Sequence, residues 1–377
     1  MSETTQRLTL EAMQILLAAR VPVLLWGDPG TGKTTTIEKF AEAAGWGVET
    51  VVASLYDPTD IGGLPVRTPQ GVVLEPPAWA RRVAGRDTDT LVFFDEINTA
   101  TPATQNALMR VVLSGHVGDL DLGAKARFAA AANPPEQNSG AWELSAPLAN
   151  RFAHLRWPLG VDEWAAAYLG GWPAPEPLKT PDPDPSRVSF HRVMQTAFVR
   201  RRAGVLCAPP DGTGLAADSG AQGWPSPRTW ERTATCLAAA DAAGAQPDVS
   251  TLVAEALLGT ATAAEYLAFL ADLDLPDPEA LLADPASLVL PERPDQQLAC
   301  LHAVAAVTEH NTPARWAKGF EVCIAAAQQD APDIAMTAAR TFAAIRPPRA
   351  RLPQDHDVLN DVFLEQLDPD LDPEADQ

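Results

Sequence analysis

The sequence predicts an α/β fold, with a parallel five-stranded sheet flanked by helices, followed by an all-helical second domain. Two observations predict it. Between residues 8 and 160, five short apolar runs alternate with helical or looped segments, which is the pattern of a parallel sheet with helices on both faces. From about residue 226 onward the strand-like runs disappear, and Ala- and Leu-rich helical segments broken by Gly, Pro and Asp replace them.

The elements of the α/β part follow in order. Residues 8–20 have apolar positions at helical spacing, and Pro22 is expected to stop this helix. The apolar run VPVLLW is typical of a buried parallel strand, and TTTIEKFAEAAG of a helix that ends at Gly45. The remaining predicted strands are VETVVAS (48–54), TLVFFDE (90–96), RFAAAANP (127–134) and AHLRWPL (153–159).

Composition divides the rest of the chain. The stretch GGWPAPEPLKTPDPDPSR has the proline-rich, acid-punctuated composition of a semi-rigid linker. We therefore expect the α/β core in residues 1–169, the linker in 170–225, the helical domain in 226–350 and an acidic tail in 351–377. The tail ends in EQLDPDLDPEADQ and is expected to be partly disordered, with a partner-binding role left open.

The net charge limits the classes of partner. The formal net charge of -21 disfavours non-specific binding of nucleic acid, because an acidic surface repels phosphate backbones. Solubility alone would account for this charge equally well. Arg81-Arg82 and Arg200-Arg201-Arg202 are local basic clusters, which we interpret as solvated faces or subunit contacts.

The expected cellular compartment is inferred from two kinds of segment that the sequence does not show. No apolar run is long enough to span a bilayer, and the first residues, MSETTQRLTLEAMQ, show neither a basic leader nor an apolar h-region. We expect a cytoplasmic protein without membrane insertion. The cysteines are far apart and show no metal-ligand pairing, so we expect reduced, buried thiols at Cys207, Cys236, Cys300 and Cys323.

The loop after the first strand carries the clearest chemical signal. GDPGTGKT satisfies the pattern G-x-x-x-x-G-K-S/T, with a predicted strand before it and a predicted helix after it. Glycines let successive N–H groups point at a phosphate chain, and the helix adds the positive end of its dipole. Lys33 would reach the β- and γ-phosphates, and Thr34 would ligate Mg²⁺. A simple glycine-rich turn is the alternative. The candidate binding residues are Gly27, Asp28, Pro29, Gly30, Thr31, Gly32, Lys33, Thr34 and Thr35.

Two adjacent carboxylates favour hydrolysis of a bound nucleotide. Asp95 and Glu96 end an apolar strand, where side chains emerge at the carboxyl edge of the sheet beside the glycine-rich loop. One of these carboxylates can hold Mg²⁺ through its waters, and the second can polarise an attacking water. Without the loop, two solvated acids at a strand end would be the better interpretation.

Three further residues are candidates. Asn133, at the end of another apolar strand, could orient water and sense a γ-phosphate. Arg151 follows a predicted helix, and Arg228 lies in the first turn of a helix with Ser226 as its expected N-cap and Pro227 at its first position. Each has an ordinary alternative: a turn-forming Asn before Pro, or surface arginines at helix ends.

The motifs together resemble a known family. WGDPGTGKT, LVFFDEINTA, AAANPPE, ELSAPLANRF and SPRTW, in this order, resemble an AAA+ ATPase of the MoxR type, in the helix-2-insert clade with magnesium-chelatase ATPase subunits and MCM helicases. The resemblance covers about residues 8–240. It implies a P-loop AAA+ core with a C-terminal helical lid, Walker A at Lys33 and Thr34, Walker B at Asp95 and Glu96, sensor 1 at Asn133, an arginine finger at Arg151 and sensor 2 at Arg228.

The clade's inserted hairpins have counterparts here. DPTDIGGLPVRTPQGVVLEPPAWARRV, with a core at about 59–83, is similar to the helix-2 insert, and a tight turn at RTPQG predicts a hairpin directed at a central pore. Residues 113–128 resemble the second hairpin. Between them, Thr101 is the expected N-cap of a helix whose apolar residues Ala107, Leu108, Val111 and Val112 face the sheet. MoxR proteins usually continue DEIN with Arg, whereas Thr99 follows here, so the function of that arginine is open.

The resemblance implies a motor that uses ATP and Mg²⁺. We expect a homo-oligomeric ring, a hexamer, in which Arg151 enters the neighbouring subunit's site and hydrolysis moves the hairpins to remodel a protein client. It also implies a von Willebrand factor A-domain protein as partner, and nucleic acid is not the expected partner. The alternatives are a DNA translocase or helicase-like motor, which the net charge disfavours, and a nucleotide-gated scaffold, which Glu96 disfavours.

Overall fold

The chain folds into two compact units in the computed structural model, which describes residues 2–69, 71–134, 142–171, 175–180, 182–209, 223–273, 275–308, 312–329 and 331–353. Unit 1 consists of Met1–Pro183 and Gly204–Glu265, and unit 2 of Asp184–Ala203 and Tyr266–Gln377. Each unit therefore contains two separate stretches of the sequence.

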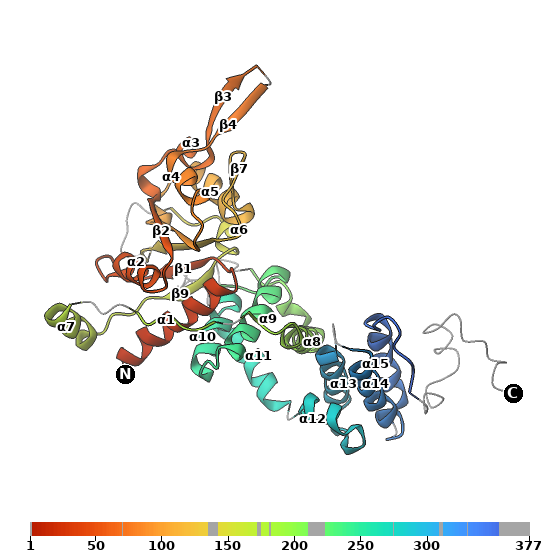
Figure 1. Ribbon diagram of the computed structural model, residues 1–377. Coiled ribbons are helices and arrows are strands. Elements are labelled where there is room, and N and C mark those ends of the chain that lie inside the picture. Colours follow the sequence, from red (N-terminus) through yellow and green to blue (C-terminus); the bar gives the residue numbers. More distant parts are fainter. Residues whose placement is uncertain are drawn as a thin grey trace. The chain divides into compact units, whose positions relative to one another are not determined.

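Unit 1 is built on a five-stranded parallel sheet with the strand order β2-β5-β8-β1-β9 (Figure 1). Strand β1 and the first five residues of β5 are buried, as expected for a parallel sheet covered on both faces. All five strands were predicted from the sequence, and the structure confirms them. Their bounds are β1 Val23–Trp26, β2 Gly47–Val52, β5 Thr90–Asp95, β8 Ala126–Ala132 and β9 Ala153–Arg156.

Short helices connect the strands and cover the sheet. Helix α5 shows how the sequence defines its ends: the Thr101 side chain accepts from the Thr104 N–H, Pro102 is the first helical residue, and Gly115 ends the helix with φ 67°. The bounds are α1 Ser2–Ala18, α2 Lys33–Ala43, α3 Pro58–Gly62, α4 Ala78–Ala84, α5 Pro102–Ser114, α6 Ala146–Ala149 and α7 Val161–Gly170, with the 3-10 helices η1 Ala53–Leu55 and η2 Ile97–Thr99.

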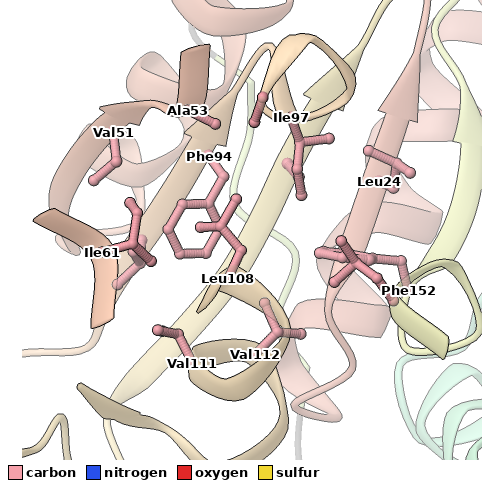
Figure 2. Close-up of a cluster of buried hydrophobic side chains, with 14 of the residues drawn as sticks. Leu24, Val51, Ala53, Ile61, Phe94, Ile97, Leu108, Val111, Val112 and Phe152 are labelled. Carbon is pink, nitrogen blue, oxygen red and sulfur yellow. The ribbon is translucent and has the colours of Figure 1, made fainter. Parts of the chain in front are cut away.

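The core of unit 1 joins α5 to the sheet. Strand β5 contributes Phe94, and α5 contributes Leu108, Val111 and Val112, all of them buried (Figure 2). This confirms that the apolar side of the helix faces the sheet, with Ala107 partly buried beside it. Truncating a fully buried leucine such as Leu108 to alanine typically costs about 2–5 kcal/mol, so this contact fixes the strand that carries Asp95 and Glu96.

Two hairpins extend from the sheet, as predicted. Strands β3 (Leu64–Thr68) and β4 (Gly71–Glu75) pair antiparallel, as do the shorter β6 (His116–Val117) and β7 (Leu120–Asp121) (Figure 1). At Gly118, with φ 59°, an added Cβ would lie 2.5 Å from the Leu74 carbonyl oxygen. A glycine is therefore required where the second hairpin crosses the first.

Three helices complete unit 1. Helices α9 and α10 pack on each other and on α1, so the chain returns to the α/β core after residue 204. Helix α11 contains the division between the two units, at Glu265. The bounds are α9 Pro227–Ala242, α10 Pro247–Leu258 and α11 Thr260–Asp272, with the 3-10 helix η4 Ala203–Val205.

Unit 2 is helical. Its core is centred on Trp316, Phe320 and Phe342, and an added Cβ at Gly319 would lie 2.6 Å from the Phe342 ring, so α14 and α15 approach closely there. Helix α8 packs on α13. The bounds are α8 Pro185–Arg201, α12 Pro278–Ala283, α13 Pro294–Thr308, α14 Pro313–Ala327 and α15 Pro332–Ala344, with the 3-10 helix η6 Pro285–Ser287.

The division of the chain differs from the boundaries expected from composition. The segment 170–225, expected as a linker, contains the 17-residue helix α8. Asp184 caps this helix and Pro185 is its first residue, and proline at that position starts a helix rather than preventing one. Residues 226–265 belong with the α/β core, not with the later helices. Residues 172–174, 181 and 210–222 of that segment, and 354–377 of the expected tail, lie outside the described residues.

Two smaller expectations concern thiols and membranes. Cys236, Cys300 and Cys323 are buried free thiols, as expected, but Cys207 is exposed, which corrects the expectation for that residue. Burial raises the pKa of the Cys236 thiol to about 12. Among the described residues, no helix combines the length and the hydropathy that a bilayer span requires.

Candidate nucleotide-binding site

The glycine-rich loop follows β1 at the carboxyl edge of the sheet. At Gly27 an added Cβ would lie 2.9 Å from the Trp157 carbonyl oxygen, so only glycine allows the chain to pass there. Gly30 and Gly32 have φ values of 77° and 82°, a conformation that other residues adopt rarely. The indole Nε1 of Trp157 donates to the Thr31 carbonyl at 3.2 Å. The loop is therefore shaped by its glycines and braced by Trp157.

Lys33, the first residue of α2, is held over this loop. Its side chain is 7% exposed, and its Nζ donates to the Gly27 carbonyl at 2.7 Å, the Asp28 carbonyl at 2.9 Å and the Asn133 side-chain oxygen at 3.1 Å. Burial lowers the pKa of Lys33, while the negative charges of Asp95, Asp28 and Glu96 oppose that shift. A positive charge thus stands between the loop and strand β8.

Thr34 connects the loop to β5. Its hydroxyl donates to an oxygen of Asp95 at 2.8 Å, and the other oxygen of Asp95 accepts from the Glu96 N–H at 2.9 Å. A hydroxyl and a carboxylate this close are hard oxygen ligands of the kind that Mg²⁺ prefers.

Glu96 has a backbone conformation that is uncommon for a side-chain-bearing residue, with φ 53° and ψ 40°. Two hydroxyls fix it: Thr99 donates to its carbonyl at 2.7 Å, and Ser54 donates to its carboxylate at 3.0 Å. Non-glycine residues in this conformation occur often at functional sites. Thr99 therefore supports the turn that presents Glu96.

Asn133 completes the group at the end of β8. Asn98 holds its backbone on both sides: the Asn98 amide donates to the Asn133 carbonyl at 2.8 Å, and the Asn98 side-chain oxygen accepts from the Asn133 N–H at 3.4 Å. The Asn133 side chain is thereby directed to Lys33.

These residues enclose one pocket of about 340 Å³. Its composition fits a nucleotide polyphosphate with Mg²⁺, because backbone N–H groups at a helix N-terminus, a lysine and a hydroxyl-carboxylate pair stand together. The structure thus brings together most of the predicted binding residues. The lining is Pro29, Gly30, Thr31, Gly32, Lys33, Thr34, Thr35, Asp95, Glu96 and Asn133. Gly27 and Asp28 contribute through their carbonyls.

The two predicted arginines are not among the residues that line this pocket. Arg151 follows α6, and its guanidinium donates to the Pro147 carbonyl. Burial, and then the charge of Arg228, lowers the pKa of Arg151. Arg228 lines a separate hollow of about 310 Å³ with Arg232 and Glu231.

Asn150 joins the elements that carry these two arginines. The Ser226 hydroxyl donates to the Asn150 side-chain oxygen at 2.9 Å and accepts from the Thr229 N–H at 3.2 Å. Ser226 is therefore the N-cap of α9, as predicted, and it also links α9 to the turn that bears Arg151.

A buried imidazole lies on β9, the edge strand that follows the turn with Arg151. His154 on β9 accepts from the Trp26 indole at 3.0 Å and bonds the Ala149 carbonyl through its other nitrogen at 2.9 Å. Complete burial lowers the pKa of His154 to about 4. His154 is thus neutral at physiological pH and couples β1, β9 and α6.

Sequence reasoning missed Ser54, Asn98, Asn150, His154 and Trp157. One signal could have found Ser54: it follows β2, and the carboxyl ends of neighbouring parallel strands meet at one edge of the sheet. The others act through contacts distant in sequence, which a single sequence does not pair.

A match to one protein family covers the residues of this site. Residues 22–152 match the family described as the AAA domain (dynein-related subfamily), which implies ATP binding by this part of the chain. No curated protein matches the chain. A putative ATPase from Cytophaga hutchinsonii is similar at 15% identity over 71% of this chain and 89% of that one, with a TM-score of 0.44. A full-length MCM homolog from Methanopyrus kandleri has 19% identity over 70% and 54%, with a TM-score of 0.37.

Proposed function

We propose that this protein is a MoxR-type AAA+ ATPase that hydrolyses ATP in a hexameric ring and remodels a protein client, together with a von Willebrand factor A-domain partner. The observation that carries the ATPase proposal is the convergence of Lys33, the Thr34–Asp95 pair, Glu96 and Asn133 on one pocket. The AAA-domain match covers these residues.

Each residue has a role that follows from its contacts. The loop N–H groups and Lys33 bind the phosphates. Thr34 and Asp95 would hold Mg²⁺, which supplies neutralisation of phosphate charge when bound. Glu96 accepts the proton of the attacking water, and Asn133 orients that water.

The ring proposal is supported by the position of Arg151. The described residues that line the pocket include no arginine, while hydrolysis of this kind gains a factor of roughly 10³–10⁵ from an arginine on the transferring phosphoryl group. Arg151 is half-buried outside this lining, which supports the proposal that it acts at the site of a second copy. Turnover then depends on assembly.

A mixing experiment tests this arrangement. Arg151→Ala should bind ATP normally and hydrolyse it poorly. Adding Lys33→Ala subunits should restore part of the ATPase activity, because their own site is inactive but their Arg151 is intact. Arg156→Ala is the matched control, because Arg156 is an exposed arginine five residues later on β9. Absence of rescue, with both variants folded, would contradict a shared site.

The proposal that the protein remodels a client rests on the resemblance to MoxR-type ATPases and on the β3–β4 hairpin. Leu64 and Val72 are 57% and 70% exposed there, so apolar side chains are available to a protein segment. The test is whether the ATPase rate rises with an A-domain protein or with DNA. Stimulation by DNA alone would favour the translocase alternative, and a bound but unhydrolysed nucleotide would favour the scaffold.

A further inference from the structure

Helix α8 is basic in an acidic chain. It carries Arg187, Arg192, Arg200 and Arg201 and no acidic residue, whereas the whole chain has 49 Asp and Glu against 28 Lys and Arg. The ATPase site lies in unit 1 and makes no use of this helix, so its charge needs a separate explanation.

A groove of about 580 Å³ lies along this helix in unit 2, between α8 and α13. The two helices are adjacent in Figure 1. The α8 residues that line the groove follow helical spacing and so share one face. Leu298 and Ala299 of α13 form an apolar floor with Val193 and Ala197, and the volume is in the range of ligand-binding pockets. The rest of the lining is Thr196, Arg200, Arg201, Arg293 and His302.

The edge of the groove is positively charged. Arg200 and Arg201 are exposed, and Arg293 is paired with the exposed carboxylate of Asp272 at 3.1 Å. Burial, and then the charge of Arg200, lowers the pKa of His302, which lines the same groove. No acidic side chain is among the described residues that line the groove.

An apolar floor with a guanidinium edge fits a peptide in which apolar and acidic side chains alternate. A nucleic-acid strand fits less well, because the described lining offers no aromatic side chain on which a base could stack.

The chain itself contains such a peptide. Residues 354–377 include nine Asp and Glu and no Lys or Arg, and their apolar residues concentrate in DVFLEQLDPDLD, residues 361–372. Phe363 lies ten residues beyond Pro353, the last described residue, and ten residues can span up to about 35 Å. A compact unit of about 100 residues has a radius of gyration of about 13 Å, so this span is comparable with the width of such a unit.

We propose that residues 361–372 dock in the α8–α13 groove of the same chain, with Phe363 and Leu364 on the apolar floor and the neighbouring carboxylates on Arg200 and Arg201. The tether supplies an effective concentration in the millimolar range, so weak contacts suffice. The proposal does not depend on the ATPase proposal.

Photo-crosslinking in the full-length protein tests this docking. A benzoylphenylalanine at position 363 should crosslink to α8 or α13, as located by peptide mass spectrometry, within one chain. Mixing isotope-labelled and unlabelled protein separates crosslinks within a chain from those between chains. Crosslinks outside the groove, or only between chains, would overturn the proposal.

Charge-reversal variants provide the matched comparison. The double variant Arg200→Glu, Arg201→Glu should lower the crosslinking yield at least fivefold. Arg340 is an exposed arginine on α15 in the same unit, and Arg340→Glu should leave this yield unchanged. An equal loss of crosslinking yield in both variants would show that the effect comes from the change in net charge and would overturn the proposal.

A synthetic peptide of residues 361–372 gives an independent measurement. It should bind a full-length variant with Asp361→Asn, Glu365→Gln, Asp368→Asn and Asp370→Asn more tightly than the wild-type chain, whose own segment competes. Equal affinity for both proteins would contradict docking within the chain. Binding of a single-stranded oligonucleotide at Arg200 and Arg201 in place of the peptide would assign the groove to nucleic acid.

Discussion

The hydroxyl of Ser54, in η1 just after β2, donates at 3.0 Å to the carboxylate of Glu96, the proposed catalytic base just after β5. A hydrogen bond to a carboxylate stabilises its charged form and fixes its direction. The bond therefore restrains the rotation of the Glu96 carboxylate.

Removing this bond should raise the basal ATPase rate. Ser54→Ala releases the Glu96 carboxylate from a hydrogen bond worth about 1.5–3 kcal/mol, so the carboxylate can turn toward the attacking water, and we expect an increase in kcat of up to roughly tenfold. Ser54→Thr retains a hydroxyl and should stay near the wild-type rate. Steady-state phosphate release measures the difference, and a lower kcat in Ser54→Ala would instead make Ser54 a positioning residue for catalysis.

Lys33 and Glu96 should separate binding from turnover. Lys33→Met removes a charge held over the loop and should weaken ATP binding by roughly 10–100-fold, as expected for loss of a charge-assisted hydrogen bond. Glu96→Gln keeps the shape but not the base, so it should bind ATP normally and lose nearly all hydrolysis.

Equilibrium binding of a fluorescent ATP analogue and phosphate release are the two measurements. With ATP, Glu96→Gln should also elute from size-exclusion chromatography as the assembled ring. A monomeric profile under those conditions would count against assembly driven by bound ATP.

The sequence predicted the sheet and the pocket because both depend on local patterns. Each strand is a short apolar run, and Lys33, Asp95 and Asn133 each follow or end such a run at the same edge of the sheet. Parallel topology alone then brings these residues together, without knowledge of any long-range contact.

Composition did not predict the division into units. Prolines near residue 180 suggested an extended linker, yet Pro185 begins α8, whose neighbour α13 lies more than ninety residues later. The pairing of Asn150 with Ser226 is likewise set by tertiary packing. Such contacts have no signature in the local sequence, whereas the cap at Ser226 does, and was predicted.

Ser226→Ala should affect stability and catalysis in different ways. Loss of the cap should lower the free energy of unfolding by about 0.5–2 kcal/mol. The same change removes the bond to Asn150 that links the start of α9, which carries Arg228, to the turn that carries Arg151, so hydrolysis should fall while ATP affinity stays near the wild-type value. Ser226→Asn restores an N-cap and is the control. Chemical denaturation measures the free energy of unfolding, and parallel assays measure ATP affinity and the rate of hydrolysis. If ATP affinity falls as much as the hydrolysis rate, these arginines contribute to ATP binding in their own subunit and do not act only on hydrolysis.

His154 should make the protein less stable as the pH falls. Its pKa is about 4 in the folded protein against about 6.5 in the unfolded chain, so between these values the unfolded chain binds the additional proton. The stability from the neutral imidazole is fully present above about pH 6.5 and is lost progressively down to about pH 4. At 1.36 kcal/mol for each pKa unit, the loss is about 3 kcal/mol.

The physical cause is that protonation would place a charge among buried groups and convert the nitrogen that accepts from Trp26 into a second donor. Urea denaturation from pH 7.5 to 4.5 measures the slope, and His154→Gln should flatten it relative to wild type. Carboxylates titrate in the same range in every variant, so the comparison is the difference between slopes. His116→Gln, on β6, should keep the wild-type slope, and an unchanged slope in His154→Gln would mean that the imidazole is not held neutral.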